Sequence, residues 1–299
     1  MRKIWFIFLV ILTMSMLVFS SLLNACANPS PTPAATPTPP KPTIAPPQAI
    51  SWVTPSVPVT LTVDLGANRS TYTSGGTQVS GDFYQPQGKG PFPAILVLHG
   101  GSCPPEGIRT YASWLATQGY VALAPDYLTP VNLARGEKWA GIDMRASTDR
   151  IREIQGDGLE SLKSLPYVDP NRIGVVGFSL GGYFAFILDT RNDVKAIISY
   201  YGAYYGNPVN QLLTAYTFAD IVTQMKAPVL MLQADADESV PIAYANTARN
   251  LLTDSGKQPE YVVYPGAGHL FNFQGVSFDA KAAADAEQKV LTFLKTKLQ

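Results

Sequence analysis

One serine lies in a setting that favours nucleophilic chemistry. The stretch RIGVVGFSLGGYFAF, residues 172–186, places Ser179 between Gly177 and Gly181, directly after a strand-like apolar run. Small neighbours on both sides allow a serine to occupy a strained turn between a strand and a helix and to present its hydroxyl above a sheet. A purely structural turn would use the same glycines, so the partners of Ser179 decide between the two interpretations.

A serine hydroxyl is a weak nucleophile at neutral pH and needs a base, most often a histidine that a carboxylate orients. The chain has only two histidines, His99 in LVLHGGSC and His269 in YPGAGHLF. In hydrolases that carry a serine on such a strand-to-helix turn, the acid and the histidine follow the nucleophile in the chain. His269 is therefore the predicted base, and the segment LMLQADADESVP offers Asp235, Asp237 and Glu238 as the acid.

The elements that must position these residues follow from apolar runs. Eight strand-like runs are predicted from residue 59 onward, and the middle ones are continuously apolar, as in strands buried on both faces of a parallel sheet. Helical patterns separate most of them, but the first two runs, VTLTVDL and TQVSGDFYQP, lack one and are predicted to pair as an antiparallel hairpin. The prediction is an α/β fold with a mostly parallel eight-stranded sheet, helices on both faces, and the site at the carboxyl ends of the strands.

A negative charge that develops on a substrate carbonyl needs hydrogen-bond donors near the serine. The backbone N–H of Leu180, directly after Ser179, is one predicted donor at this oxyanion hole. A second donor is predicted from the HGGSC loop after the third strand, where Gly101 or Ser102 supplies it. His99 is then interpreted as a residue that shapes this loop.

Composition excludes several classes of function. Over 299 residues the formal net charge is zero and charged residues make up 15%, with no dense Lys/Arg cluster, so we expect no nucleic-acid partner. The two histidines, the two cysteines and the lack of C-x-x-C or H-E-x-x-H motifs predict no metal, and no cofactor is implied. No disulfide is expected, because Cys103 has no intramolecular partner if Cys26 is lipidated.

The N-terminal residues have the pattern of an export signal. Two basic residues precede an apolar run, and the sequence LNAC that ends at Cys26 resembles the lipobox of bacterial lipoproteins, although Asn24 departs from its usual small or apolar residue. The resemblance implies a signal peptide over residues 1–25, a diacylated Cys26 as the first mature residue, and attachment to the extracytoplasmic side of the cell membrane. The apolar run is also long enough for an uncleaved transmembrane anchor, which stays open as the alternative.

Residues 26–58 form a predicted linker that begins with the lipidated cysteine. The segment is rich in proline, threonine, alanine and serine and carries almost no charge. Proline favours the extended polyproline II conformation, so we expect a semi-rigid spacer between a membrane and a catalytic domain over residues 59–299. Trp52 and the apolar residues near it are candidates to pack on that domain.

Several of these stretches together resemble the dienelactone hydrolase family of α/β-hydrolases, from about Val79 to the C-terminus: RIGVVGFSLGGYFAF, the preceding YVDPN, the following AIISYYGAYY, the ADESVP loop and YPGAGHLF. Members of that family hydrolyse esters or lactones without a cofactor, through a nucleophile, an aspartate and a histidine. The family pattern places the acid four residues before a proline, and with Pro241 this spacing implies Asp237 as the acid. Asp235 is then a turn or helix-start residue.

The resemblance is incomplete at two positions. Many members use cysteine as the nucleophile, whereas this chain has Ser179, and the HGGSC loop lacks the acidic residue that the resemblance would place near Gly100. It therefore implies a serine esterase or lactonase of the wider family, acting on a small-molecule substrate through an acyl-enzyme. A peptidase of the same fold and a non-catalytic ligand-binding lipoprotein stay open as alternatives. Four aromatic residues are candidate walls of an acyl pocket, with core packing expected for at least half of them: Phe178, Tyr127, Tyr201 and Phe271.

Overall fold

The computed structural model describes residues 47–52, 55, 58–133, 144–204, 216–275 and 277–299. The predicted signal peptide, the predicted lipidation site Cys26 and most of the predicted linker lie outside these residues. In the described part of the chain, no helix combines the length and the hydropathy needed to cross a bilayer.

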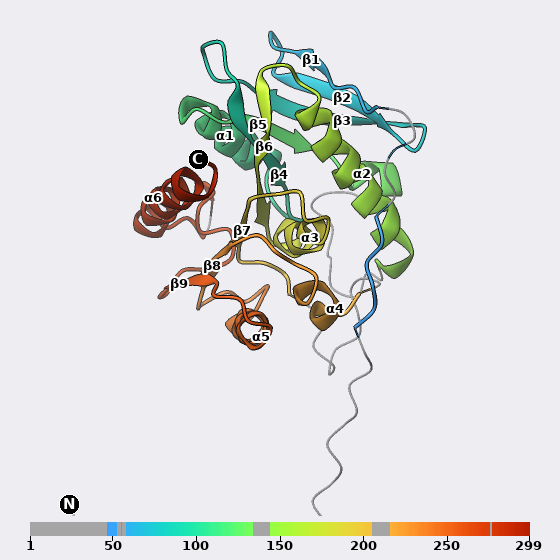
Figure 1. Cartoon of the computed structure of the whole chain (residues 1–299). Coiled ribbons are helices and arrows are strands. Elements are labelled where there is room, and N and C mark those ends of the chain that lie inside the picture. The colour runs from blue at the N-terminus through green and yellow to red at the C-terminus, as the bar shows by residue number, and fades with distance from the viewer. Residues whose placement is uncertain (1–46, 53–54, 56–57, 134–143, 205–215, 276) are drawn as a thin grey trace, which may run out of the picture. The chain divides into compact units, whose positions relative to one another are not determined.

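Among the described residues, nine strands form one sheet in the order β1-β2-β3-β5-β4-β6-β7-β8-β9 (Figure 1). Neighbours from β5 to β9 pair in parallel, whereas β1, β2 and β3 extend one edge by antiparallel pairing. The strands are β1 (Thr62–Asp64), β2 (Arg69–Ser74), β3 (Thr77–Tyr84), β4 (Phe92–Leu98), β5 (Val121–Pro125), β6 (Val168–Phe178), β7 (Ala196–Tyr200), β8 (Val229–Ala234) and β9 (Glu260–Tyr264).

The sheet has nine strands and not the predicted eight, because β2 was missed. This strand pairs with both β1 and β3, so the two apolar runs predicted to form a hairpin are not direct neighbours. The buried positions of β2 are Ser70, Tyr72 and Ser74. Serines at two of the three inward positions hide the apolar alternation on which a strand prediction depends.

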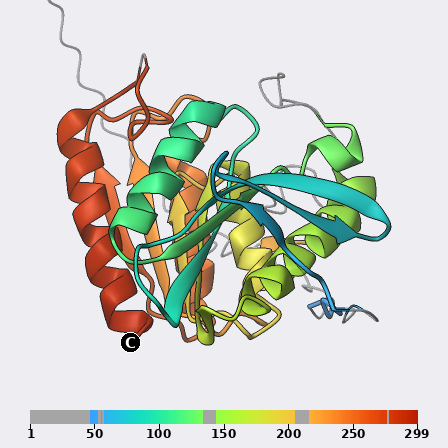
Figure 2. The same ribbon diagram turned by 90° about the horizontal axis from the view of Figure 1, so that it is seen from above.

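Helices cover both faces of the sheet, which confirms the predicted α/β class. Helices α1 and α6 pack on one face, and α2, α3, α4 and α5 contribute to the core on the other (Figures 1 and 2). The helices of the described residues are α1 (Pro105–Thr117), α2 (Arg145–Lys163), α3 (Leu180–Asp189), α4 (Phe218–Val222), α5 (Ile242–Asp254), α6 (Ala280–Lys297) and the short 3-10 helix η1 (Thr129–Val131).

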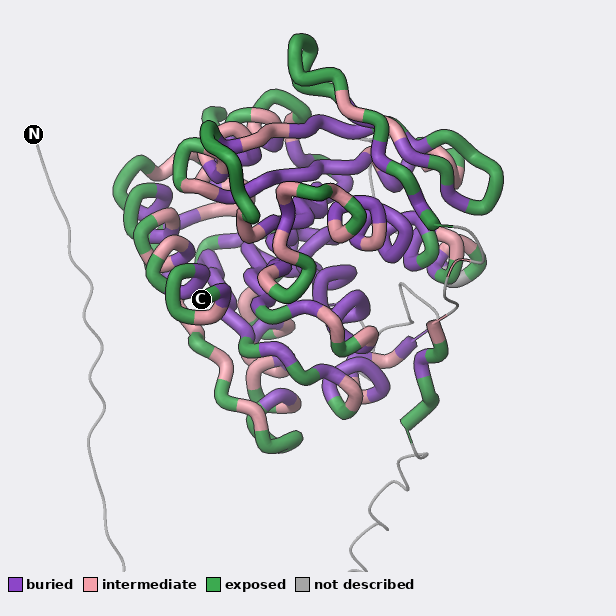
Figure 3. Tube along the Cα trace, turned by 45° about the horizontal axis from the view of Figure 1, so that its top comes forward, coloured by how far each residue is buried: buried purple, intermediate pink, exposed green. Residues whose placement is uncertain are grey.

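The central strands are buried almost throughout (Figure 3). Every residue of β5, β7 and β8 is buried, as expected for strands that are covered on both faces. The apolar side chains of each face pack into a separate cluster, one beneath α1 and α6 and the other beneath the remaining α-helices. This double packing fixes the carboxyl ends of β6, β8 and β9, which carry the candidate site residues.

An N-terminal strap, residues 47–52, is held on this domain although it was assigned to the linker. The backbone N–H of Gln48 donates to Asp220 Oδ1 (2.6 Å), and that of Ile50 donates to Gln224 Oε1 (2.9 Å). The amide of Gln224 donates back to the carbonyl oxygen of Gln48 (3.0 Å). Ile50 is buried in the core cluster of the α2 and α3 face. These bonds align the strap with α4 and the loop after it.

Trp52 fastens the end of the strap to α2 and α3. Its Nε1 donates to Thr190 Oγ1 (2.8 Å). The guanidinium groups of Arg152 and Arg191 lie over its ring, 4.5 and 5.2 Å from the centroid, at distances where cations attract the aromatic face. Arg152 also donates to the carbonyl oxygen of Ser51 (2.7 Å). Trp52 therefore packs on the domain, as predicted.

Candidate active site

Ser179 occupies a strained backbone conformation between β6 and α3, with φ 53° and ψ −116°. Residues other than glycine rarely adopt a positive φ, and such strain concentrates at functional sites. The neighbouring glycines are required by close packing. A Cβ atom on Gly177 would lie 2.2 Å from the carbonyl oxygen of Gly181, and one on Gly181 would lie 2.1 Å from that of Leu98. The turn has the geometry of a nucleophile elbow.

The structure brings Ser179, His269 and Asp237 together in a hydrogen-bonded chain. They lie in the loops that follow β6, β9 and β8, respectively. His269 Nε2 lies 3.1 Å from Ser179 Oγ, and His269 Nδ1 lies 2.7 Å from Asp237 Oδ2. The side chains of His269 and Asp237 are only 10% and 1% exposed. Exclusion from water strengthens these hydrogen bonds, because the local dielectric constant is low.

Asp237 is held by backbone donors as well as by the histidine. Its Oδ1 accepts the N–H groups of Ser239 (2.9 Å) and Val240 (2.7 Å), while Oδ2 faces His269. These bonds satisfy a buried carboxylate and fix its direction. Because the carboxylate can only accept, Nδ1 of His269 carries the hydrogen, and Nε2 is left to accept the hydrogen of the Ser179 hydroxyl.

The other two candidate acids, Asp235 and Glu238, are exposed. Asp235 Oδ1 accepts the backbone N–H of Gly266 (2.6 Å), and the next residue, Ala236, donates its N–H to the carbonyl oxygen of Ala267 (3.1 Å). Asp235 therefore fastens the loop after β8 to the loop after β9, which carries the histidine. Asp237 is the candidate acid that the fold brings to the imidazole.

Two backbone segments adjoin the nucleophile where an oxyanion would form. Leu180 is the first residue of α3, so its N–H is among the first helical amides, which have no partner within the helix. On the other side, Gly100 packs directly against Ser179, because a Cβ on Gly100 would lie 2.8 Å from Ser179 Cβ. Glycine is thus needed here for close approach of the loop after β4.

The loop after β4 is fastened by a residue that sequence reasoning missed. Cys103 Sγ accepts the backbone N–H of Gly100 (3.2 Å), and the predicted donors Gly101 and Ser102 lie between these two residues. Gly101 is buried and Ser102 is exposed. No local pattern marks a buried thiol as a hydrogen-bond acceptor, so only the structure identifies Cys103 as part of the loop.

His99 shapes the start of the same loop. Its ring is buried and stacks on Tyr127, with centroids 4.4 Å apart and an interplanar angle of 19°. The hydroxyl of Tyr127 donates to the carbonyl oxygen of His99. All four candidate pocket aromatics, Tyr127, Phe178, Tyr201 and Phe271, are fully buried in the apolar clusters, and Tyr201 also packs its ring against His269.

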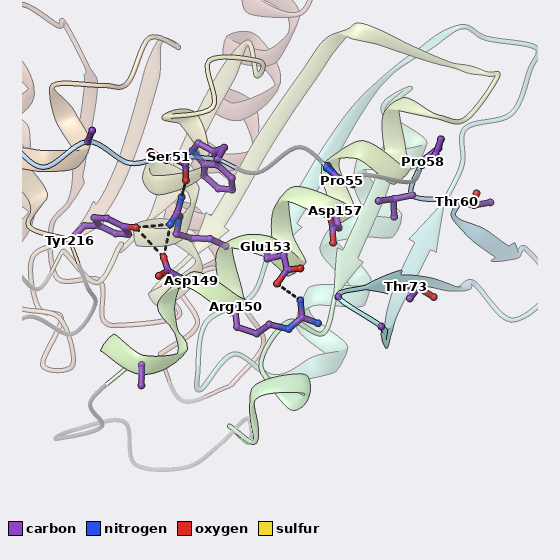
Figure 4. Close-up of a pocket in the computed structure, with 17 residues that line it drawn as sticks. Ser51, Pro55, Pro58, Thr60, Thr73, Asp149, Arg150, Glu153, Asp157 and Tyr216 are labelled. Carbon is purple, nitrogen blue, oxygen red and sulfur yellow. Dashed lines mark hydrogen bonds and ion pairs between the residues drawn. The ribbon is translucent and has the colours of Figure 1, made fainter.

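A cavity of about 1250 Å³ lies at a different place, lined by strap residues, by Pro58 to Thr60, by the turn between β2 and β3, and by α2 (Figure 4). None of the three candidate catalytic side chains lines it. Arg152 pairs with Asp149 (2.6 Å) and Arg150 pairs with Glu153 (2.6 Å). Arg152 also holds the strap through the carbonyl oxygen of Ser51, whereas Arg150 donates to Ser74 at the end of β2, so we interpret these paired charges as structural groups of the cavity wall.

The arrangement at the ends of β6, β8 and β9 can transfer an acyl group. A hydroxyl faces an imidazole, a buried carboxylate orients that imidazole, and the first backbone amide of α3 directly follows the serine. Among the described residues, no group of three or more His, Cys, Asp or Glu side chains is arranged to hold a metal ion.

Comparison with known proteins assigns the chain to a family. A model of the dienelactone hydrolase family matches residues 79–298. The chain belongs to the dienelactone hydrolase family. Similar proteins include the Synechocystis sp. "putative carboxymethylenebutenolidase", 28% identical over 251 residues, with 80% of this chain and 100% of that protein covered.

Solved structures of similar proteins agree with the fold. The Klebsiella pneumoniae "putative dienelactone hydrolase" is 26% identical with a TM-score of 0.65, covering 74% of this chain and 95% of that one. Pyrococcus horikoshii acylaminoacyl peptidase is 19% identical with a TM-score of 0.62, covering 80% of this chain and 41% of that one, and this likeness shows the fold alone. This dienelactone hydrolase family member is therefore a hydrolase with an α/β-hydrolase fold.

Proposed function

We propose that this dienelactone hydrolase family member is a serine hydrolase that cleaves a carboxylic ester or lactone through an acyl-enzyme. The observation that carries the proposal is the continuous chain from Ser179 through His269 to Asp237, with contacts of 3.1 and 2.7 Å. A serine in this setting is activated as it attacks, because the imidazole accepts its proton. The names of the related carboxymethylenebutenolidase and dienelactone hydrolase proteins support the class of bond.

In the acylation step, His269 Nε2 takes the proton of the Ser179 hydroxyl while Oγ forms a bond to the substrate carbonyl carbon. The carbonyl oxygen gains the negative charge, and the N–H of Leu180 together with an N–H from Gly101 or Ser102 stabilises it. The imidazolium then gives its proton to the leaving alcohol oxygen. The bond from the carbonyl carbon to that oxygen breaks, and Ser179 is left acylated.

Deacylation repeats these events with water. His269 takes a proton from a water molecule, the resulting hydroxide attacks the acyl carbon, and the bond to Ser179 Oγ breaks. The imidazolium returns its proton to Oγ and the carboxylic acid leaves. In both steps Asp237 accepts the Nδ1 hydrogen at 2.7 Å and so stabilises the imidazolium.

A fluorophosphonate probe and a substrate panel test this proposal. We expect the probe to label Ser179, and Ser179→Ala to abolish labelling and to reduce ester turnover by roughly 10⁴- to 10⁶-fold. Ser161→Ala, which removes a buried serine hydroxyl on α2, serves as the matched control and should be labelled like the wild type. The panel contains short acyl esters, lactones and peptide anilides.

Each result of the panel has a defined meaning. Turnover of esters or lactones that Ser179→Ala lacks supports the proposal. Preference for peptide anilides would replace it with a peptidase, and turnover by Ser179→Ala at the wild-type rate would remove Ser179 from the mechanism. A wild-type chain that is neither labelled nor active on any arm would favour a ligand-binding role.

We also propose that the enzyme works outside the cytoplasm, anchored by lipid on Cys26. The basis is the basic start, the apolar run and the LNAC sequence of residues 1–26, followed by a proline-rich segment. Two or more acyl chains give stable anchoring, so the protein should stay on membranes through high-salt washing. Labelled palmitate should enter the wild type and the Cys103→Ser control but not Cys26→Ser. An unmodified Cys26 still joined to Ala25 in the wild type would leave the transmembrane anchor.

A further inference from the structure

Tyr201 lies at the end of β7 in a conformation that its side chain disfavours. Its φ is 36°, in the left-handed region, where a bulky residue is strained. The residues around it are bonded to the backbone of the nucleophile. The N–H of Ser179 donates to the carbonyl oxygen of Tyr200 (2.9 Å), and the carbonyl oxygen of Ser179 accepts the N–H of Ala203 (2.9 Å). The N–H of Tyr201 donates to the carbonyl oxygen of Leu232 (2.7 Å). The backbone of Tyr201 is therefore fixed relative to the elbow.

The side chain of Tyr201 reaches the loop that carries the base. Its ring meets the imidazole of His269 with centroids 4.7 Å apart at 60°, and its hydroxyl donates to Asn272 Oδ1 (2.6 Å). Tyr201 is fully buried, and burial raises the pKa of its hydroxyl well above the usual value, so the group stays protonated and acts as a donor. One side chain thus contacts the imidazole directly and holds its loop through Asn272.

The loop itself transmits this hold to the histidine over a short distance. Leu270, directly after His269, has a φ of 65°, and Phe273 donates its N–H to the carbonyl oxygen of Leu270 (2.9 Å). Asn272 lies inside this closed turn, three residues after the histidine. A displacement of Asn272 therefore moves the backbone that carries His269.

We propose that Tyr201 is a positioning residue that couples the elbow of Ser179 to the loop of His269. The inference rests on the proposed function, because it concerns the 3.1 Å contact between His269 Nε2 and Ser179 Oγ. Without the bond from Tyr201 to Asn272, the loop is held less firmly and fewer molecules have the imidazole in line with the hydroxyl. The loss falls on the chemical step, because misplacement of about 1 Å costs up to roughly 100-fold in rate.

Tyr201→Phe keeps the ring and removes only the hydroxyl, and Asn272→Ala removes the partner. We expect each variant to lower kcat on a short aryl ester by roughly 10- to 100-fold, with KM within about twofold, and to slow fluorophosphonate labelling by the same factor. The double variant should be no slower than the slower single variant, because both remove one interaction. Tyr204→Phe is the matched control, since its buried hydroxyl donates to Ser199 Oγ at the same 2.6 Å.

The outcomes separate this inference from the proposed function. If the wild type neither turns over esters nor labels at Ser179, the proposed function fails. If the wild type is active and Tyr201→Phe and Asn272→Ala both match Tyr204→Phe in kcat, only the positioning role is overturned. Additive losses in the double variant would also overturn it, because the two groups would then act separately. Thermal unfolding of each variant shows whether it is folded. If Tyr201→Phe does not fold, the kinetics of Asn272→Ala alone test the positioning role.

Discussion

The active-site loops and the N-terminal strap both rely on side chains that accept backbone N–H groups, but their partners lie at different distances along the chain. Asp237 accepts from Ser239 and Val240, two and three residues away. In the strap, Gln48 donates to Asp220, which lies 172 residues away. The local shape of the loop that carries Asp237 is thus encoded within a few residues, whereas the strap is held by contacts between residues far apart in the chain.

The two regions also differ in what they do to stability. Ser179 and Tyr201 hold positive φ angles of 53° and 36°, and strain of this kind costs about 1–3 kcal/mol per residue. In the strap, burial of Ile50 and the cations over Trp52 are favourable contacts. The difference indicates that the domain gains stability at the strap and gives up some of it at the site. Substitutions on the two sides should therefore affect different measured quantities.

The largest expected effect is on the chemistry. Asp237→Asn should lower kcat/KM by roughly 10³- to 10⁴-fold, because the amide no longer stabilises the imidazolium or fixes the tautomer of His269. Asp235→Asn is the matched control and should cost less than about tenfold, since its amide oxygen can still accept the N–H of Gly266. Steady-state kinetics on one ester measures both. A larger loss in Asp235→Asn would reassign the acid.

The sequence predicted the parts of the site that short motifs define. The elbow around Ser179 and the loops that carry Asp237 and His269 could be identified from residue spacing, the family resemblance and chain order, and the structure brings the three together. Cys103 and Asn272 could not be found in this way. Their roles depend on contacts with Gly100 and with Tyr201, and the second of these pairs is 71 residues apart.

The same distinction applies to the fold. The buried central strands and the helices on both faces were predicted, because continuous apolar runs are a local signal. Strand β2 was missed because its buried positions include Ser70 and Ser74. The strap was assigned to the linker because its segment is rich in proline, and this local composition predicts an extended spacer. A contact that holds it joins Trp52 and Thr190, which lie 138 residues apart and meet only after folding.

A smaller effect is expected from the strap, and on stability instead of catalysis. Trp52→Ala in the full chain should lower the free energy of unfolding by about 3 kcal/mol, because it removes a large packed ring, two cation contacts and one hydrogen bond. Trp52→Phe keeps a ring and should lose about 1 kcal/mol. Urea unfolding measures both, and Leu65→Ala, at a residue that is 56% exposed, should change little.

The activity of Trp52→Ala decides what the strap does. At a temperature where both proteins are folded, the kcat/KM of Trp52→Ala should equal that of the wild type. The hydrogen bonds described for the strap include those to Asp220, Gln224 and Thr190, and none of them involves a candidate catalytic side chain. A selective loss of kcat without a loss of stability would contradict the division between the two regions. A chain that begins at Val59, the predicted domain boundary, lacks the whole strap and should be less stable than one that begins at Pro46.

The smallest expected effect is a change in stability with pH that comes from Asp189, on the strap side of the sheet. Like Asp237, its carboxyl group accepts two backbone N–H groups. Asp189, at the end of α3, accepts the backbone N–H groups of Lys226 (2.9 Å) and Ala227 (3.1 Å) and is fully buried. Burial raises its pKa to about 6, against the lowering effect of these two donors. The folded protein therefore binds this proton more tightly than the unfolded chain does.

The sign of the resulting pH dependence follows from that difference. Between the unfolded pKa near 4 and the folded pKa of about 6, the native state carries more protons, so this group makes the protein less stable as the pH rises. From pH 5 to pH 7 its contribution should fall by about 1 kcal/mol. Asp189→Asn cannot ionise, so its free energy of unfolding, measured in urea at pH 5, 6 and 7, should improve relative to the wild type by that amount as the pH rises. Parallel curves for the two proteins would mean that Asp189 is ionised in the folded domain at pH 5. Asp189 would then be an anion held by the backbone N–H groups of Lys226 and Ala227, without the imidazole that faces Asp237.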